Sequence, residues 1–250
     1  MKGRAAVEEA NAANSRVLVL GTGTSVGKTF VTAALLRALR NLSAAAPPLG
    51  LKLVETGLGA TSDARILALA GGLDERLAEP CYAFLPPVSP HLAAERAGTR
   101  IEPQRLANWV REREQRPAGG TVSITLLETA GGAFTPLGPD LCNADLAVWL
   151  DVRAVVLVAP DRLGVLHDVT AALRALAAMA IRVDAVVLSA VSPPDASSTT
   201  NAPELERLGL FAPCLFVPRD DAGAIFPLAR ELLRNLPDSP RRHVAQLTDR

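Results

Sequence analysis

The chain has 250 residues, 49% of them hydrophobic, and no Pro-, Gly- or Ser-rich linker divides it, so we expect one large α/β domain. Its 26 basic and 26 acidic residues balance, which excludes a basic field for nucleic acid or an anionic membrane and favours a small-molecule substrate. Cys81, Cys142 and Cys214 form neither a metal-ligand spacing nor a disulfide framework, and neither a signal peptide nor a charge-free apolar run of about 18 residues occurs, so we expect a cytoplasmic protein.

The first predicted strand, residues 17–20, leads into a glycine-rich turn and then into a predicted helix over residues 29–42. The turn runs from Gly21 to Thr29 and reads G-T-G-T-S-V-G-K-T, a phosphate-binding loop of the longer G-x-x-x-x-x-G-K-T form. Its glycines let backbone N–H groups converge on a phosphate, Lys28 supplies a cation, and the Thr29 hydroxyl can ligate Mg²⁺. A simple glycine-rich turn with a surface lysine is the weaker interpretation, so the sequence predicts a nucleoside triphosphate site.

The second predicted strand, residues 50–54, contains Lys52, and a predicted helix over residues 62–70 begins beside Asp63. A charge inside an apolar strand costs free energy unless it meets an anion or water. Lys52 is therefore either a solvated residue of a strand edge or a cation that faces a bound anion. Asp63 is either a helix-capping residue or a carboxylate associated with a metal ion.

A predicted helix over residues 103–114 precedes the third predicted strand, residues 123–127, which Glu128 closes before Thr-Ala-Gly-Gly. A carboxylate that ends a buried strand in a phosphate-loop protein usually holds Mg²⁺ and its waters. The alternative is a glutamate that faces solvent. Upstream, His91 is predicted to be a loop or helix-start residue rather than a general base.

The rest of the chain alternates in the same way, with predicted strands over residues 154–159, 185–188 and 214–217 and predicted helices over residues 165–180 and 222–233. Strands this apolar are buried on both faces, which is typical of a parallel sheet between helices. We therefore predict a doubly wound, mainly parallel α/β fold of the phosphate-loop NTPase type over residues 16–235. Residues 1–15 and 236–250 are predicted to be mobile tails.

Taken together, these patterns resemble ATP-dependent dethiobiotin synthetases, the enzymes of biotin biosynthesis that close a ureido ring, over most of residues 16–235. The block at residues 128–137 is the most specific, because a generic phosphate-loop ATPase has no reason to carry it together with the lysine motif. In chain order, the resemblance rests on the phosphate loop, K-x-V-x-T-G at residues 52–57, Ser62-Asp63, Ser89-Pro90-His91, E-x-A-G-G-x-F-T-P-L at residues 128–137, Ala144-Asp145-Leu146, Leu163-Gly164 and Pro193-Pro194.

The resemblance implies an enzyme that captures CO₂ as a carbamate on 7,8-diaminononanoate, phosphorylates the carbamate with ATP, and lets the second amine displace phosphate. Carbamate and γ-phosphoryl group are both anions, and Lys28, Lys52 and Mg²⁺ would offset their repulsion. By the same resemblance Lys52, Lys28 and Thr24 are catalytic, and Thr24 and Thr56 bind substrate. The family forms homodimers, which we expect here too, with no nucleic acid or membrane partner.

The resemblance also implies a metal site and a nucleotide site. Mg²⁺ would be held by Thr29, Asp63 and Glu128. The residues expected to bind ATP are Ser25, Val26, Gly27, Lys28, Thr29, Phe30, Asp63, Glu128, Ser189 and Pro218.

The chain departs from the family pattern at four positions. The family often has glutamate at Ser25, proline at Leu53 and glycine at Thr129, and the asparagine that reads adenine aligns with Ser189. Three alternatives therefore stay open: a divergent relative with another amine or relaxed nucleotide choice, a regulatory ATPase of the same fold, and a pseudoenzyme. Regulatory relatives usually carry a second lysine early in the loop, where this chain has Gly23.

Overall fold

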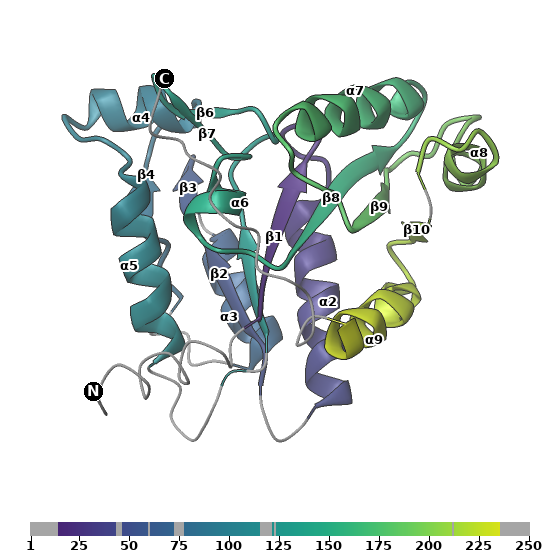
Figure 1. Ribbon diagram of the computed structural model, residues 1–250, viewed down its shortest axis with the longest axis horizontal. Coiled ribbons are helices and arrows are strands. Elements are labelled where there is room, and N and C mark those ends of the chain that lie inside the picture. The colour runs from purple at the N-terminus through teal and green to yellow at the C-terminus, as the bar shows by residue number, and fades with distance from the viewer. Residues whose placement is uncertain are drawn as a thin grey trace.

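The computed structural model describes residues 15–43, 47–59, 61–72, 78–115, 122, 124–211 and 213–235. At its centre lies a six-stranded sheet in the order β10-β9-β8-β1-β5-β2, in which every neighbouring pair is parallel. Figure 1 shows this sheet in the middle of the molecule with helices on both sides, which confirms the predicted fold class. Its strands are β1 (Ser15–Gly21), β2 (Leu49–Lys52), β5 (Ile124–Glu128), β8 (Ala154–Asp161), β9 (Ala185–Ala190) and β10 (Cys214–Val217).

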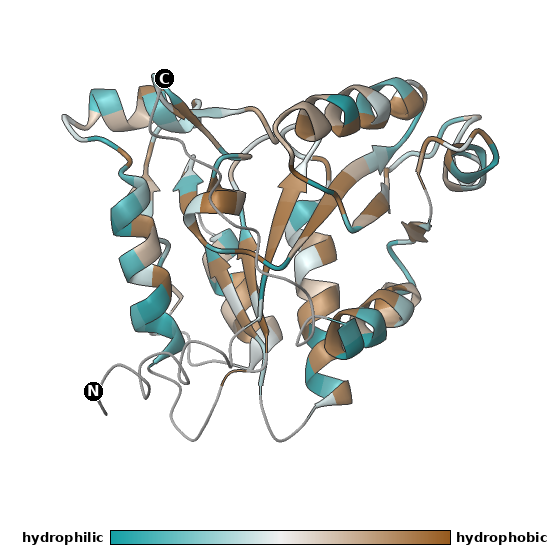
Figure 2. Ribbon diagram, viewed as in Figure 1, coloured by the Kyte–Doolittle hydropathy of each residue, from teal (hydrophilic) through white to brown (hydrophobic). Residues whose placement is uncertain are grey.

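Side chains of each strand alternate between the two faces of the sheet, and helices cover both faces. Val17 and Val19 of β1 pack with α2, α3 and α9, whereas Leu18 and Leu20 pack with the helices from α4 to α8. All four side chains are at most 1% exposed, and β1 is largely hydrophobic in Figure 2. The helices are α2 (Lys28–Leu42), α3 (Asp63–Gly71), α4 (Pro90–Arg96), α5 (Pro103–Glu114), α6 (Leu146–Trp149), α7 (Val165–Ala178), α8 (Asn201–Arg207), the 3₁₀ turn η2 (Ala222–Ile225) and α9 (Phe226–Asn235).

The predicted helices are found close to their expected bounds, except that the predicted helix at 222–233 is split into η2 and α9. Helices α4, α6 and α8 were not predicted, because segments of 7, 4 and 7 residues carry too little periodicity. Ser15 begins β1 instead of belonging to the N-terminal tail. Residues 1–14 and 236–250 of the predicted tails, and Ser123 of the predicted strand 123–127, lie outside the described residues.

The predicted strand at residues 50–54 is divided between two sheets. After β2 ends, β3 (Val54–Thr56) pairs with β4 (Tyr82–Phe84) in a separate two-stranded sheet. Leu53 joins the two sheets, because its N–H donates to the Glu128 carbonyl at 3.1 Å and its own carbonyl accepts from the Tyr82 N–H at 3.3 Å. A proline, which the resemblance often places at this position, has no N–H to donate. Leu53 therefore ties the backbone next to Lys52 to the backbone of Glu128.

A hairpin of β6 (Pro136–Gly138) and β7 (Leu141–Cys142) follows β5 and is the only antiparallel pair among the described strands. The hairpin begins inside the family-like block at residues 128–137, with Pro136, and ends beyond it at Cys142. None of the described helices is long and apolar enough to span a bilayer.

Candidate functional site

A cavity of about 340 Å³ opens at the carboxyl ends of β1, β2 and β5, where ligands bind in doubly wound folds. Most of the residues that the sequence singled out line it, and Val26, Glu128, Ser189 and Pro218 do not. The lining consists of Thr24, Ser25, Gly27, Lys28, Thr29, Phe30, Lys52, Glu55, Thr56, Asp63, Ala130, Gly131 and Arg219.

The phosphate loop begins where β1 ends and finishes as the N-terminal cap of α2. Gly27, at that cap, has φ 93°, which a residue with a side chain rarely adopts. A Cβ added to Gly27 would lie 2.3 Å from Oγ of Ser189, so the loop backbone lies directly against β9. Lys28 Nζ donates to the Gly23 carbonyl at 3.1 Å, which holds the lysine along the loop.

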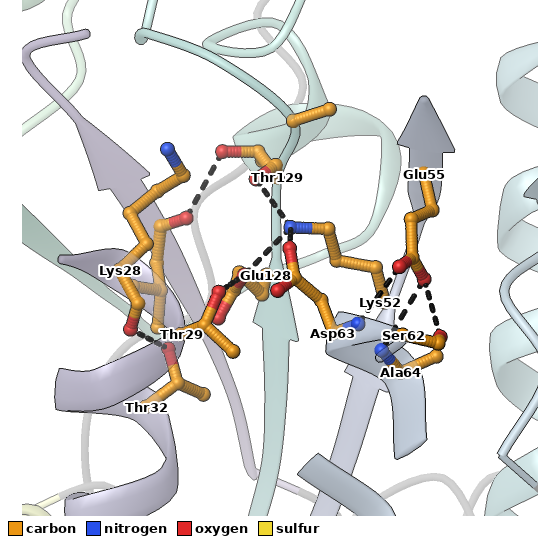
Figure 3. Close-up of polar contacts among 12 residues, drawn as sticks. Lys28, Thr29, Thr32, Lys52, Glu55, Ser62, Asp63, Ala64, Glu128 and Thr129 are labelled. Atoms are coloured by element: carbon orange, nitrogen blue, oxygen red, sulfur yellow. Dashed lines mark hydrogen bonds and ion pairs between the residues drawn. The ribbon is translucent and has the colours of Figure 1, made fainter. Parts of the chain in front are cut away.

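Lys52 joins the two predicted carboxylates in one ion-pair cluster, in which Lys52 and Glu128 are buried and Asp63 is partly exposed (Figure 3). Its Nζ lies 2.6 Å from Oε1 of Glu128 and 2.7 Å from Oδ2 of Asp63. Thr29 Oγ1 donates to the same Glu128 oxygen at 2.9 Å. The phosphate loop, β2, α3 and β5 thus bring four separate segments of the chain to one point. Lys52 is not a solvated edge residue, since it is 5% exposed.

Burial alone would lower the pKa of Lys52, but the charges of Glu128 and Asp63 outweigh burial and raise that pKa above its ordinary value. Burial alone would raise the pKa of Asp63, but the positive charge of Lys52 and its hydrogen bond outweigh burial, so the pKa of Asp63 is lowered from its ordinary value. The amine of Lys52 is therefore an ammonium and the Asp63 carboxyl an anion at neutral pH.

Lys28 behaves differently because it has no carboxylate within ion-pair distance among the described residues. Burial, followed by repulsion from Lys52, lowers the pKa of Lys28 to about 8. A phosphate beside this lysine would supply the missing counter-charge and raise its pKa again.

The donor set at the cluster fits a magnesium ion bound together with phosphate. Glu128 is fully buried, yet its Oε2 has no hydrogen-bond partner among the described residues. The Thr29 hydroxyl donates to the other oxygen of this carboxylate, and Lys52 links the carboxylate to that of Asp63. The described residues hold no group of three or more His, Cys, Asp or Glu side chains suited to a metal. Mg²⁺, which keeps water and phosphate ligands, needs only one or two carboxylates.

Glu55, which the sequence analysis missed, holds the start of α3. Its carboxylate is 6% exposed and accepts from the Asp63 N–H at 2.7 Å, the Ser62 hydroxyl at 2.8 Å and the Ala64 N–H at 3.3 Å. An anion at a helix N-terminus satisfies free N–H groups and meets the positive end of the helix dipole. Glu55 thereby positions Asp63, and no local sequence signal links a residue of β3 to a helix start beyond it.

We expect Glu55→Ala to lower the free energy of unfolding by about 2 kcal/mol, because it removes charged hydrogen bonds from buried donors. Glu55→Gln, which keeps one acceptor, should lose about half of that. Urea unfolding of both variants measures the difference. Glu206→Ala is the matched control, since that carboxylate accepts a single backbone N–H, from Cys214, away from the cavity. Equal stability of Glu55→Ala and the parent protein would show that Glu55 does not hold α3.

The segment after β5 packs directly on the phosphate loop, which explains the glycines in the block at residues 128–137. A Cβ on Gly132 would lie 3.3 Å from the Gly23 backbone, and the Ala133 N–H donates to the Gly21 carbonyl at 2.7 Å. Asn143, also missed from sequence, is 1% exposed and donates to the carbonyls of residues 130 and 132 at 2.6 and 2.8 Å. The buried Asn143 amide therefore fixes the backbone of residues 130–132, which packs on the phosphate loop.

One further departure from the family pattern has a structural explanation. Thr129 is fully buried and its hydroxyl donates to the Val19 carbonyl at 3.1 Å, which ties β5 to β1. Ser25 has φ 58°, lines the cavity and is exposed, and nothing in the structure explains the serine there.

Ser189 and Pro218 lie on the β9–β10 side of the loop. Ser189 is 1% exposed, sits behind Gly27, and its Oγ has no partner among the described residues. Pro218 follows β10 and immediately precedes Arg219, which does line the cavity. His91 is the second residue of α4, as a helix-start residue should be, and is exposed.

A family model described as an AAA domain matches residues 15–220. The ATP-dependent dethiobiotin synthetase BioD of Caulobacter sp. (strain K31) is 37% identical over 222 residues, covering 84% of this chain and 91% of that protein. The protein of the same name from Rhodopirellula baltica is 33% identical over 212 residues, covering 77% and 80%. That from Acidiphilium cryptum is 34% identical over 213 residues, covering 81% and 92%.

Two solved structures share the fold. The MinC:MinD cell division protein complex of Aquifex aeolicus gives a TM-score of 0.55 at 15% identity, covering 88% of this chain and 96% of that chain. HypB from Helicobacter pylori in complex with nickel gives a TM-score of 0.51 at 13% identity, covering 92% of this chain and 91% of that chain. At these identities the likeness shows the fold alone.

Proposed function

The chain belongs to the ATP-dependent dethiobiotin synthetase family, and we propose that it converts 7,8-diaminononanoate, CO₂ and ATP into dethiobiotin, ADP and phosphate. The observation that carries the proposal is the ion-pair cluster of Lys52 with Asp63 and Glu128. Lys52 and Asp63 line the same cavity as the phosphate loop, and Glu128 lies buried behind them. A switch ATPase needs the loop but has no evident use for a buried ammonium opposite it.

In the proposed reaction the loop N–H groups and Lys28 hold the β- and γ-phosphates. The carbamate formed from one substrate amine and CO₂ lies beside Lys52, with its oxygen directed at the γ-phosphorus. That oxygen forms the new P–O bond as the bond to the β-phosphate oxygen breaks, and ADP leaves. The second amine then attacks the carbonyl carbon, releasing phosphate and a proton as the ring closes.

Lys52 is suited to this step because its ammonium is held in place before the substrate arrives. A preorganised cation stabilises the charge that develops on the transferring group without rearrangement during the reaction. The hydroxyls of Thr24 and Thr56, both on the cavity wall, supply hydrogen bonds for the carbamate and the amines. Mg²⁺, held by Thr29, Asp63 and Glu128, would neutralise phosphate charge when bound.

The test supplies diaminononanoate, ¹³C-labelled bicarbonate and Mg-ATP, and follows ADP together with labelled dethiobiotin by mass spectrometry. We expect one ADP for each dethiobiotin and ADP formation that depends on the diamine. ATP hydrolysis at the same rate without the diamine, and no labelled product, would identify a switch ATPase instead.

The homodimer stays a prediction from the resemblance, and the cytoplasmic location stays a prediction from the cysteine spacing and the segments of the sequence. Light scattering coupled to size exclusion tests the first, with about twice the 26.2 kDa chain mass expected.

We also expect nucleotide affinity to fall as pH rises, because the lowered pKa of Lys28, about 8, leaves this lysine mostly deprotonated above that pH in the free protein. Binding at pH 9 must then take up a proton, which weakens affinity about tenfold relative to pH 7. The unfolded chain, with the ordinary lysine pKa of 10.5, binds more protons than the folded protein between about pH 8 and pH 10.5, so the nucleotide-free protein gains stability as pH rises through that window.

Nucleotide dissociation constants at pH 7 and pH 9 measure this effect. Lys28→Arg is the control, because a guanidinium stays charged throughout this range and should give a flat profile. The same pH dependence in Lys28→Arg and in the parent protein would assign the titration to another group.

A further inference from the structure

Arg219 and Phe30 form a pair at the end of the cavity that the proposed reaction does not use. The Arg219 guanidinium lies over the Phe30 ring at 4.8 Å from its centroid, and its Nε donates to the Ala190 carbonyl at 3.0 Å. Phe30 belongs to the first turn of α2, Ala190 ends β9, and Arg219 follows β10. Three elements thus hold one exposed guanidinium at a defined place on the cavity wall.

The order of residues along the cavity indicates which part of a nucleotide reaches this pair. In a phosphate loop the lysine reaches the β- and γ-phosphates and the following threonine faces the metal, so the γ-phosphate points towards Lys52. Phe30 comes after Lys28 and Thr29, on the side of β9 and β10 rather than of β2. A nucleotide bound as the proposed function requires therefore extends its base towards Arg219.

Arginine carries only hydrogen-bond donors. With Nε bonded to Ala190, the two terminal Nη groups of Arg219 have no further partner among the described residues. Guanine presents two acceptors, O6 and N7, on one edge, and a guanidinium can donate to both. Adenine presents N7 beside an amino group, which is itself a donor, so one of the two bonds is lost.

Ser189, the residue expected from the sequence to read the base, cannot contact it from where it lies. It is 1% exposed behind Gly27 and does not line the cavity. The side chain that this end of the cavity presents to a base is therefore the donor-only guanidinium of Arg219.

We propose that Arg219, held by Phe30 and Ala190, is a specificity-determining residue that reads the base edge and favours purines with an oxygen at C6. It raises the preference for GTP and ITP relative to ATP about tenfold, the effect of one charged hydrogen bond. The inference rests on the proposed nucleotide site and concerns which base that site prefers.

The experiment measures kcat/KM for dethiobiotin formation with ATP, GTP, ITP and CTP, and dissociation constants for the same nucleotides without the diamine. We expect GTP and ITP to support turnover within tenfold of ATP in the parent protein. In Arg219→Ala the GTP-to-ATP ratio should fall about tenfold. In Arg219→Gln it should fall further, because glutamine can pair with both N6 and N7 of adenine. Arg207→Ala, an exposed arginine paired with Glu204 elsewhere, is the control and should change nothing.

Three other outcomes would overturn the role of Arg219, and they show whether the proposed function fails with it. An equal loss for all four nucleotides in Arg219→Ala would mean that the guanidinium contacts phosphate or stacks without reading the base. Unchanged ratios with normal dethiobiotin formation would overturn the role of Arg219 and leave the proposed function intact. Failure of every nucleotide to bind or to support product formation in the parent protein would overturn both.

Discussion

Lys52→Ala is expected to abolish dethiobiotin formation while nucleotide still binds. In the proposed reaction the phosphate loop and Lys28 hold the triphosphate, whereas Lys52, on the wall of the same cavity, faces the group that is transferred. Loss of one preorganised charge donor costs about 3–4 kcal/mol in the transition state, a fall in kcat of about 100- to 1000-fold. Single-turnover product formation and nucleotide titration separate the two effects. Turnover above about a tenth of the parent rate, equivalent to about 1.4 kcal/mol, would exclude this role.

The same substitution should destabilise the protein, so the kinetic result needs a control for folding. Lys52→Ala leaves the carboxylate of Glu128, which is fully buried, without its cation. Removal of one partner of a buried ion pair costs about 3–5 kcal/mol. The double variant Lys52→Met, Glu128→Gln removes both buried charges and should recover much of the stability. Recovery of turnover in that variant would show that Lys52 serves the fold alone.

Glu128→Gln should raise the Mg²⁺ concentration needed for half-maximal turnover by about 10- to 100-fold. One oxygen of Glu128 accepts from Lys52 and Thr29, and the other is buried with no partner among the described residues. An amide keeps the shape of the side chain but removes the charge that a cation needs. Lys52 keeps its ion pair with Asp63, which limits the loss of stability.

Glu114→Gln provides a matched control for this experiment. Glu114 is 8% exposed and pairs with Arg16 at 2.6 Å, at the start of β1 and away from the cavity. It should lower the melting temperature without moving the Mg²⁺ dependence. Mg²⁺-dependent nucleotide binding, measured by fluorescence, gives a second readout that does not rely on turnover. An unchanged Mg²⁺ response in Glu128→Gln, with a large fall in melting temperature, would make Glu128 structural.

The sequence by itself determined the features that depend on neighbouring residues. The phosphate loop is a strand, a turn and a helix start that follow one another between Val17 and Leu42, so local order is enough to recognise it. The parallel sheet could also be predicted from the sequence, because strands that are buried on both faces need an unbroken apolar run. The position of Glu128 at a strand end then placed it at the ligand edge of the sheet.

The tertiary structure alone decided which of these residues meet. Lys52, Asp63 and Glu128 come from three elements, and each had a solvated or capping alternative until the sheet order put β5 beside β2. The charges of Lys52 and Glu128 are tolerated inside the protein because they are paired, and this pairing joins segments far apart in the sequence, which no local pattern encodes.

The roles or surroundings of three further residues could not be predicted from the sequence: Glu55, Ser189 and Arg219. Glu55 looks like an ordinary strand residue until α3 begins against it, and Ser189 looks like an available hydroxyl until Gly27 covers it. Arg219 gains a fixed orientation only because Phe30 and Ala190, far away in sequence, lie beside it. Sequence spacing therefore identifies residues whose side chains could take part in binding or catalysis. Burial and contacts between distant segments decide which of them can do so.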